Sequence, residues 1–348
     1  MDSSDLYRLL HSPVFAENGP DVDIMAPFFF REGYQNEILF FFKPETFLIP
    51  RSLSKRVIHL VQEKFDEYRV VVSGVAAIRG GFLARHGIME RHYGFINELS
   101  RNASRMIENG DLRLIKSALG IDRDEETPEI LGGHEFLQRF PQYTPESLND
   151  LWFAERSVRV RSGFYVRRCE VEGTAVVLIN GFHPLQLLHY THPKHKIVIL
   201  LLHSNTAWKV LREEMVGDTY PDKAVKNSIR GLLYADETLR AQVEVSIANN
   251  FVHLSAGPFE ALSEIHNFLN SLTTFSVKET NVGRVLLAQG LSEAVIWRAL
   301  RNPVVKTEKG EESLFTVTEN LDTYMATALF IHGVELTSEL QGELDRSS

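Results

Sequence analysis

The stretch NNFVHLSAGPFEALSEIHNFL, residues 249–269, joins a short apolar segment to a helix and places one histidine, His253, at the junction. Gly257 and Pro258 favour the start of a helix there, because proline fits the first helical turn. The apolar residues that follow recur every three or four positions, so one face of this helix is expected to be buried. Glu264 lies on the opposite, polar side. The pattern leaves two interpretations of His253: a buried structural residue, or a nucleophile that carries a phosphoryl group.

Outward from this stretch, strand and helix patterns alternate along the chain. Residues 37–43 and 69–78 form compact apolar or β-branched runs, which are typical of buried strands. Residues 50–68, between them, carry apolar side chains at helical spacing. Leaving aside residues 108–180, the order is β-α-β-α-β-α-β-α, which predicts an α+β fold with a ferredoxin-like (βαββαβ) core. Further strands are predicted at 195–203 and 245–255, and further helices at 80–107, 205–217 and 258–269.

The chain is longer than one typical domain, so it contains either two domains or one core with large insertions. Residues 1–36 mix proline, glycine and acidic residues and are expected to form an irregular N-terminal arm. The core is expected at 37–269, interrupted at 96–181 by an inserted α/β segment that contains a β-hairpin. Residues 270–348 are expected to form a helical C-terminal extension.

Composition and charge limit the partners and the compartment. The net charge of −9 and the pI near 5.8 disfavour nucleic acid as the main partner. The single cysteine, Cys169, excludes an intrachain disulfide and fits a reducing compartment. The N-terminus lacks the pattern of a secretory signal, and the apolar run at 197–202 is far shorter than the roughly 20 residues of a membrane span. A cytoplasmic protein with no membrane partner is therefore expected.

The chemistry of His253 depends on its neighbours. A neutral imidazole is nucleophilic near pH 7 and can carry a phosphoryl group covalently, which divides a transfer between two substrates into two steps. A carboxylate commonly fixes the tautomer, and folding the helix back along the strand brings Glu264 near the ring. Ser255 points the same way along an extended segment and is placed to donate to a phosphate oxygen. A histidine between apolar residues is nevertheless more often structural, so this pattern alone does not decide.

Two further segments carry groups that suit phosphate. Lys43 ends its strand and precedes a proline, so its ammonium group is expected to project toward a cleft. The loop at 218–231 combines hydroxyl, ammonium and guanidinium groups, and arginine can bind phosphate with two parallel hydrogen bonds. Both features also have an ordinary explanation, because lysine-proline pairs are common where strands end and solvated loops are often basic. The polar residues of the loop include Thr219, Lys223, Lys226 and Arg230.

Taken in order, these features resemble the nucleoside diphosphate kinases over residues 37–100 and 182–269, under half of the chain. In that family a lysine-proline pair ends the first strand, as Lys43 and its proline do here. A histidine-tyrosine pair follows the first crossover, as the pair ending in Tyr93 does. The family's nucleotide loop and catalytic strand have counterparts in Gly217, Thr219, Pro221, Ser228, Ile229, Arg230 and Gly231, in Asn250-Phe251-Val252-His253, and in Glu264, eleven positions after the histidine.

The resemblance implies a divergent member of this family with a large insertion and a C-terminal extension. His253 would be the phosphorylated nucleophile, supported by Glu264 and Ser255. Mg²⁺ would bridge the phosphates of ATP or another nucleoside triphosphate, held mainly by nucleotide oxygens. Phe182 would stack on the base. The residues that would bind the nucleotide are Lys43, Tyr93, Phe182, Arg212, Thr219, Arg230 and Asn250.

Two departures from the family pattern concern the site directly. The family follows its histidine with glycine, whereas this chain has Leu254, and the aspartate of the same motif is missing. Glu213 replaces the arginine expected six residues before Thr219. Arg212 is adjacent, but one step along an α-helix turns its side chain by about 100°.

A third departure is the presence of extra residues between Arg230 and His253. Because of them Arg240 competes with Arg230 for the role of phosphate ligand. The sequence motif favours Arg230 and the spacing to the histidine favours Arg240; we expect Arg230.

Two other groups of residues have ordinary explanations. The basic stretch of the insertion either closes over a phosphate, meets a partner, or forms one solvated face of a hairpin, and the last is the more ordinary. Its arginines are Arg156, Arg159, Arg161, Arg167 and Arg168. No protein metal ligand is expected, because the histidines near proline and lysine lack the spacing of a metal site. These are His183, His189, His192 and His195.

The expected function is transfer of a γ-phosphoryl group from a nucleoside triphosphate to a nucleoside diphosphate, through phosphorylated His253. One alternative is a catalytically degenerate domain that binds nucleotides as a sensor or scaffold, which Leu254 and Glu213 favour. Another is a different enzyme on the same core, with an acceptor site supplied by the insertion. Members of the family form dimers and hexamers, which makes this chain a candidate homo-oligomer.

Overall fold

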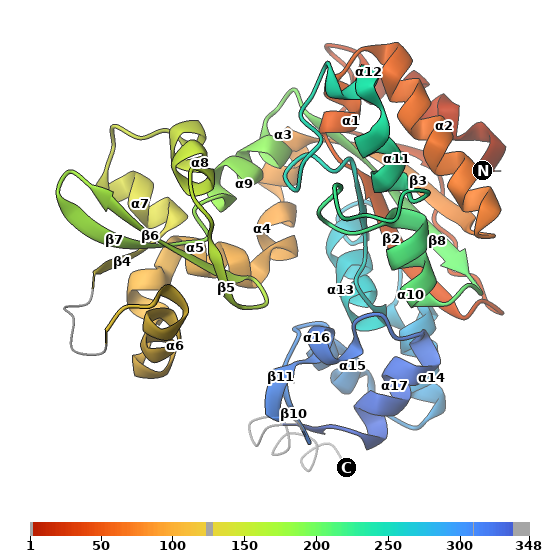
Figure 1. Cartoon of the computed structure of the whole chain (residues 1–348). Helices are drawn as coiled ribbons and strands as arrows, with labels where there is room; N and C mark the ends of the chain where they lie inside the picture. The colour runs from red at the N-terminus through yellow and green to blue at the C-terminus, as the bar shows by residue number, and fades with distance from the viewer. Residues whose placement is uncertain (1–2, 123–127, 309, 337–348) are drawn as a thin grey trace. The chain divides into compact units, whose positions relative to one another are not determined.

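The chain divides into two compact units, which we call the main unit and the inserted unit. The main unit contains residues 1–82 and 193–348, and the inserted unit contains residues 83–192 (Figure 1). No described helix is long and apolar enough to cross a membrane. The computed structural model describes residues 3–122, 128–308 and 310–336.

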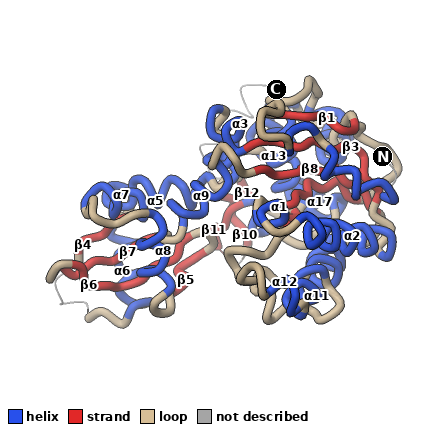
Figure 2. Tube along the Cα trace, turned by 90° about the horizontal axis from the view of Figure 1, so that it is seen from above, coloured by secondary structure: helices blue, strands red, loops and turns tan. Residues whose placement is uncertain are grey.

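The main unit is built on a five-stranded sheet in which every neighbouring pair is antiparallel. The strand order is β1-β3-β8-β2-β9, and Figure 2 shows β1, β3 and β8 side by side. The predicted strands at 37–43, 69–78 and 195–203 are confirmed, whereas β9 covers only a short part of the predicted strand at 245–255. The strands are β1 (Val22–Ala26), β2 (Asn36–Phe42), β3 (Val71–Arg79), β8 (Lys196–Ser204) and β9 (Val252–Leu254).

Side chains of this sheet alternate between two faces, and helices cover both. Phe40 and Phe42 of β2 belong to the core that contains α2. Phe41 packs on the other face against Phe268 of α13, with ring centres 5.6 Å apart. The chain between β8 and β9 adds short helices to the main unit. The helices are α1 (Glu45–Leu48), α2 (Arg51–Glu67), α10 (Trp208–Val210), the π-helix η3 (Leu211–Val216), α11 (Ile229–Ala235), α12 (Glu237–Arg240) and α13 (Pro258–Leu269).

A group of hydrogen bonds, which we call the Phe251 brace, joins the end of β2 to the start of β9. Phe251 adopts a left-handed backbone conformation with a φ of 66°, which is unfavourable for a residue with a bulky side chain. Its amide donates to Oε1 of Glu45 at 2.9 Å, and its carbonyl accepts from the Lys43 amide (2.9 Å) and the Thr46 hydroxyl (3.1 Å). The brace therefore fixes the backbone positions of Lys43 and His253 relative to each other.

Both terminal regions differ from the sequence prediction. Residues 1–36, predicted to be irregular, contain two 3₁₀-helices and strand β1. The described part of 270–348, predicted to be helical, also contains a three-stranded sheet in the order β11-β10-β12. These strands are two to four residues long, too short for sequence periodicity to detect. The elements are η1 (Ser3–His11), η2 (Pro13–Phe15), η4 (Val277–Glu279), α14 (Asn281–Ala288), α15 (Glu293–Ala299), β10 (Val304–Thr307), β11 (Gly310–Ser313), α16 (Leu314–Thr318), α17 (Thr323–His332) and β12 (Glu335–Leu336).

The C-terminal region packs against the second side of α13, next to which Figure 1 draws it in blue. Phe259 and Leu262 of α13 belong to a core that includes Phe330 of α17, and the Phe259 and Phe330 rings are 5.0 Å apart. A Cβ atom at Gly257 would lie 2.6 Å from the carbonyl oxygen of Thr318. The absence of a side chain at Gly257 is therefore what lets the C-terminal region approach the segment after β9.

The inserted unit has a four-stranded sheet in the order β4-β7-β6-β5. Strands β4 and β7 are parallel, and the other neighbours are antiparallel. Leu99 of α5 packs in the core on one face, and Trp152 of α8 packs in the core on the other. The region predicted as one or two helices at 80–107 contains three. The elements are α3 (Gly80–Arg85, at the boundary of the units), α4 (Ile88–His92), α5 (Gly94–Met106), α6 (Asn109–Leu119), β4 (Glu129–Gly132), α7 (Gly133–Arg139), α8 (Pro145–Phe153), β5 (Val158–Arg161), β6 (Phe164–Val171), β7 (Thr174–Ile179) and α9 (His183–Thr191).

Replacing Glu45 with alanine should lower the free energy of unfolding by about 1–3 kcal/mol, because the buried Phe251 amide then loses its acceptor. Equilibrium urea unfolding of the full chain measures this difference. Glu63→Ala is the matched control: Glu63 is 62% exposed on α2, and its loss should change stability by no more than about 0.5 kcal/mol. Equal effects of the two variants would show that the brace does not stabilise the fold.

Candidate active site

His253 and Glu264 lie in hydrogen-bond contact. Nε2 of His253 is 2.8 Å from Oε1 of Glu264. Because an ionised carboxylate can only accept, the neutral imidazole donates through Nε2 and its lone pair lies on Nδ1. The other oxygen of Glu264 accepts from the hydroxyl of Ser255 at 2.5 Å. Ser255 was expected to face a phosphate, but it is fully buried and bonds to the carboxylate instead.

The face of β9 on which His253 lies is set by strand alternation. The imidazole stacks on Phe41, its partner across the β2–β9 ladder, with ring centres 4.4 Å apart and planes 17° apart. Leu254 points to the opposite face, where it joins the core that contains α2. Leu254 therefore does not cover the ring, and the His253 side chain remains 19% exposed.

Three basic side chains influence the charge of His253. Burial lowers the pKa of His253 well below its usual range, and the positive charges of Lys43, Arg230 and Arg212 lower it further. The imidazole is therefore neutral near pH 7, which is its nucleophilic form. Burial also lowers the pKa of Lys43 to about 8, against the opposing effect of the Glu45 carboxylate. The two segments predicted to converge, the strand end and the 218–231 loop, do meet around the histidine.

Arg230, rather than Arg240, contributes to this group. Arg230 lies in α11, is 9% exposed, and donates to the carbonyls of Gly217 (2.9 Å) and Val252 (2.8 Å). Arg240 is exposed in α12, with its guanidinium over the ring of Tyr234. The extra residues before β9 form α12 and the loop after it, which explains why spacing alone pointed to Arg240.

Arg212 also contributes, although α-helical geometry predicted that its side chain would turn away. The segment Leu211–Val216 is a π-helix, a rare helix type that is often found at functional sites. Glu213, where the resemblance led us to expect an arginine, is exposed, with Oε1 4.0 Å from Nζ of Lys209. Arg212, rather than Glu213, therefore lies near enough to His253 to influence its charge.

The C-terminal region supplies a carboxylate to Arg212. Nη1 of Arg212 is 2.5 Å from Oε1 of Glu319 and donates to Oδ1 of Asn320 at 3.0 Å. The Asn320 amide donates to the carbonyl of Ala256 at 2.9 Å. The turn that contains Glu319 is thus held against the segment that follows His253. Its carboxylate pairs with Arg212, which was predicted from the sequence to bind phosphate.

Glu260, in the first turn of α13, is a second carboxyl group near this turn. Burial raises its pKa to about 8, and the negative charges of Glu264 and Glu319 add to the rise against the effect of Arg212. Glu260 is therefore mainly protonated at neutral pH and can act there as a hydrogen-bond donor.

Asn250 connects the loop to the strand. It is 1% exposed, and its Nδ2 donates to the carbonyls of Thr219 (3.1 Å) and Ile247 (3.3 Å). Its Oδ1 is buried and has no hydrogen-bond partner within the part of the chain that the structure describes. Thr219 itself is exposed.

Tyr93 and Phe182 belong to the inserted unit. The Tyr93 ring packs on His183 and Tyr190, with ring centres 5.7 and 5.9 Å away. Phe182 packs with Trp152 in the core beside α8. Both are thus aromatic packing residues of that unit.

Sequence reasoning missed Glu45 and Glu319. Glu45 stands in KPET, two residues after Lys43, where an acid beside a buried lysine is a signal that could have been recognised. Glu319 is distant from His253 in the sequence and belongs to a region predicted to be an appendage, so no local pattern connects them.

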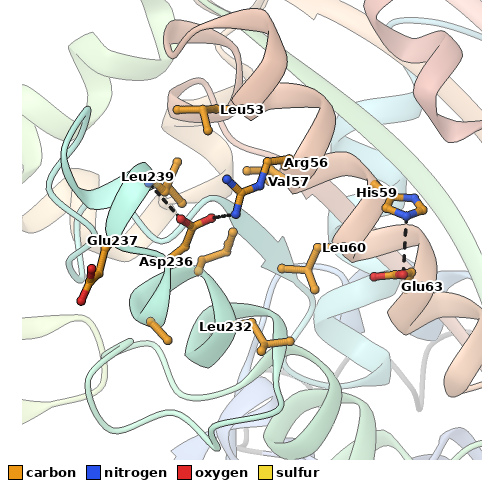
Figure 3. Close-up of a pocket in the computed structure, with 12 residues that line it drawn as sticks. Leu53, Arg56, Val57, His59, Leu60, Glu63, Leu232, Asp236, Glu237 and Leu239 are labelled. Atoms are coloured by element: carbon orange, nitrogen blue, oxygen red, sulfur yellow. Dashed lines mark hydrogen bonds and ion pairs between the residues drawn. The ribbon is translucent and has the colours of Figure 1, made fainter.

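A separate groove lies between α2 and the α11–α12 segment, with a cavity volume of about 590 Å³ (Figure 3). Arg56 and Asp236 form an ion pair of 2.6 Å within it, and Leu53, Leu60 and Leu239 contribute apolar surface. None of the residues that line this groove was predicted as part of the site.

Comparisons with known proteins find solved structures of low similarity to this chain. No protein-family model and no curated protein matches the sequence. Similar solved structures include the nucleoside diphosphate kinase from Encephalitozoon cuniculi (12% identity, TM-score 0.33, covering 69% of this chain and 94% of that one). An NDP kinase from Pyrobaculum aerophilum matches with 18% identity and a TM-score of 0.34, over 67% and 94%. A nucleoside diphosphate kinase family protein from Babesia bovis matches with 12% identity and a TM-score of 0.31, over 72% and 99%.

Lys43→Met should stabilise the protein at pH 7. The folded pKa of about 8 lies below the usual 10.5, so the buried ammonium costs about 3 kcal/mol wherever it is charged in both states. Between pH 8 and 10.5 only the unfolded chain keeps the proton, and wild-type stability rises with pH through that window. The advantage of Lys43→Met, measured by urea unfolding, should therefore be largest below pH 8 and lost near pH 10.5. A variant less stable than wild type at pH 7 would contradict this.

Proposed function

We propose that the main unit is a phosphotransferase that moves a γ-phosphoryl group from a nucleoside triphosphate to a nucleoside diphosphate through phosphorylated His253. The observation that carries the proposal is the chain Ser255–Glu264–His253, with its neutral imidazole among three cations. A histidine with only a structural role needs neither of two features seen here. One is a buried carboxylate that fixes the tautomer, and the other is a set of nearby cations that lowers the pKa of the ring.

The proposed step uses the lone pair on Nδ1. Nδ1 attacks the γ-phosphorus of the bound triphosphate, a P–N bond forms, and the bond to the β-phosphate oxygen breaks as the diphosphate leaves. The ring then carries a positive charge with its proton on Nε2, and the Glu264 carboxylate at 2.8 Å stabilises that charge. The second diphosphate takes the phosphoryl group by the reverse reaction.

The basic residues would bind and orient the phosphates. Lys43 and Arg230 are both buried polar groups beside the histidine, and charge-assisted bonds in such a setting are strong. Asn250, with its buried Oδ1, and the Thr219 hydroxyl would contact the sugar or phosphates. We propose Tyr93 and Phe182 as nucleotide contacts on the basis of the resemblance alone.

Mg²⁺ fits the proposal as an ion carried by the nucleotide. Both oxygens of Glu264 already accept hydrogen bonds, from His253 and Ser255, so the ion would be held mainly by nucleotide oxygens. When bound, the ion would neutralise phosphate charge.

We also infer that the core of the main unit is the ferredoxin-like βαββαβ arrangement. The four strands predicted from the sequence follow one another as β2-α2-β3 and β8-helices-β9, and they lie in the sheet in the order β3-β8-β2-β9. Strand β1 would then be an addition at the edge.

One observation favours a second candidate, a nucleotide-binding sensor without turnover. Glu319 already pairs with Arg212 at 2.5 Å, so the C-terminal region competes with phosphate for this cation. A site that binds nucleotide only when this contact opens would couple binding to the C-terminal region.

Incubation of the full chain with γ-labelled ATP should give an acid-labile, base-stable label on His253. His253→Ala should abolish the label and leave nucleotide binding, measured by thermal shift with ATP or GDP and Mg²⁺, largely intact. His59→Ala is the control, since His59 is 67% exposed on α2, and it should label normally. Binding without label in the wild type would favour the sensor; labelling of His253→Ala would overturn the assignment of the nucleophile.

Glu319→Gln should tighten nucleotide binding by up to about fivefold, because it removes the charge that competes for Arg212. The estimate is modest since the two side chains are 25% and 45% exposed, and exposed ion pairs contribute about 1 kcal/mol or less. Isothermal titration at low salt measures the affinity. Glu213→Gln, on the same π-helix but paired with Lys209, should leave it unchanged. Weaker binding by Glu319→Gln would mean that Glu319 supports the site.

A further inference from the structure

The arginines of the inserted unit do not share one solvated face, which corrects the more ordinary of the sequence interpretations. Successive residues of a strand point to opposite faces, so Arg167 and Arg168 diverge on β6. Arg161 pairs with Asp111 of α6 at 3.2 Å, and its guanidinium lies over the ring of Phe164. Arg168 is exposed, whereas Arg167 is buried.

The guanidinium of Arg167 is buried with few acceptors. Arg167 is 5% exposed. Its Nη2 lies 3.6 Å from Oε2 of Glu155, whose side chain is 74% exposed. Its Nε and Nη1 are buried and have no hydrogen-bond partner among the residues that the structure describes. Arginine is almost never fully buried unless it is paired, so a buried guanidinium with two nitrogens that lack hydrogen-bond partners among the described residues is unusual.

Arg167 lies in the layer between β6 and helices α7 and α8. On β6 it shares a face with Tyr165 and Cys169, and Leu178 lies opposite it on β7. Tyr165, Cys169 and Leu178 all belong to the core of this layer. Burial raises the pKa of the Cys169 thiol, and the positive charge of Arg167 opposes that rise, so the two groups are close neighbours.

The local charge is positive. Arg159 lies opposite Tyr165 on β5 and therefore faces the same side as Arg167. Arg156 is exposed in the segment between α8 and β5, next in sequence to Glu155. Arg159 and Arg167 thus face one side of the sheet, and the printed ion pair of Arg167 is with the largely exposed Glu155, which favours an anion over a cation or a neutral ligand.

We propose that the inserted unit contains an oxyanion-binding site centred on Arg167, which takes a phosphate group. Nε and Nη1 donate from different edges of the guanidinium, so they require at least two acceptor atoms, and a phosphate supplies several. The phosphate is either inorganic or part of a nucleotide. The site is independent of the chemistry at His253, because all of its residues belong to the inserted unit.

Cys169 reports on this site, since it is the only cysteine of the chain. Reaction of the full chain with Ellman's reagent should slow several-fold and saturably as inorganic phosphate replaces chloride at constant ionic strength. Phosphate would neutralise the guanidinium that favours the thiolate. Arg167→Met should react slowly and without response to phosphate, whereas Arg168→Met, altered on the opposite face, should respond as wild type does.

A wild-type rate independent of phosphate, or an equal response in Arg167→Met, would overturn the proposal. Repeating the titration with ADP separates the sources: half-saturation at lower ADP than phosphate identifies a nucleotide, and the reverse identifies the free ion. Arg167→Lys keeps the charge without the planar donors, and its half-saturation by phosphate should rise at least tenfold; an unchanged half-saturation would contradict the proposal.

The melting temperature, measured in chloride and then with phosphate added, gives a second test. A buried guanidinium that lacks acceptors destabilises the fold, so Arg167→Met should melt at or above the wild-type temperature in chloride. Added phosphate should raise the melting temperature of wild type more than that of the variant. A variant that melts far below wild type in chloride would mean that Arg167 is a structural residue, and the proposal would fail.

Discussion

The Phe251 amide donates to the Glu45 carboxylate while its carbonyl accepts from Lys43 and Thr46, and the rest of the site depends on this brace. Left-handed geometry at a phenylalanine is costly, so it persists only because several bonds and a buried ring hold it. The same bonds determine where β9 starts, and hence that His253 pairs with Phe41 and reaches Glu264. The positions of Lys43 and His253 are therefore determined by the same set of hydrogen bonds.

Charge in the site is arranged around a neutral ring. The buried carboxylate of Glu264 is satisfied by an imidazole and a hydroxyl, while cations lie nearby and are themselves partly desolvated. Strongly shifted pKa values of this kind, here at His253 and Lys43, are typical of functional sites. On the side of the C-terminal region the Glu319 carboxylate balances Arg212, whereas the mainly protonated Glu260 adds little negative charge.

Much of the sheet could be predicted from the sequence, because its strands are strongly apolar and its long helices have clear periodicity. The pairing of His253 with Glu264 follows from a strand, a turn and about two helical turns, all local. What could not be predicted depends on tertiary contacts or unusual backbone. The proximity of Arg212 to His253, the left-handed Phe251, the approach of Glu319 and the burial of Arg167 leave no trace in local spacing.

Helix α13 contributes side chains to packing on both of its sides. One side packs through Phe268 on the sheet, and the other packs through Phe259 and Leu262 on residues of the C-terminal region. The segment 37–269, drawn as a domain on sequence grounds, would thus present an apolar surface to water if it were cut free. The smallest piece of this protein able to hold Glu264 in place includes the helices that follow it, and a gene fragment ending at residue 269 would yield an aggregation-prone product.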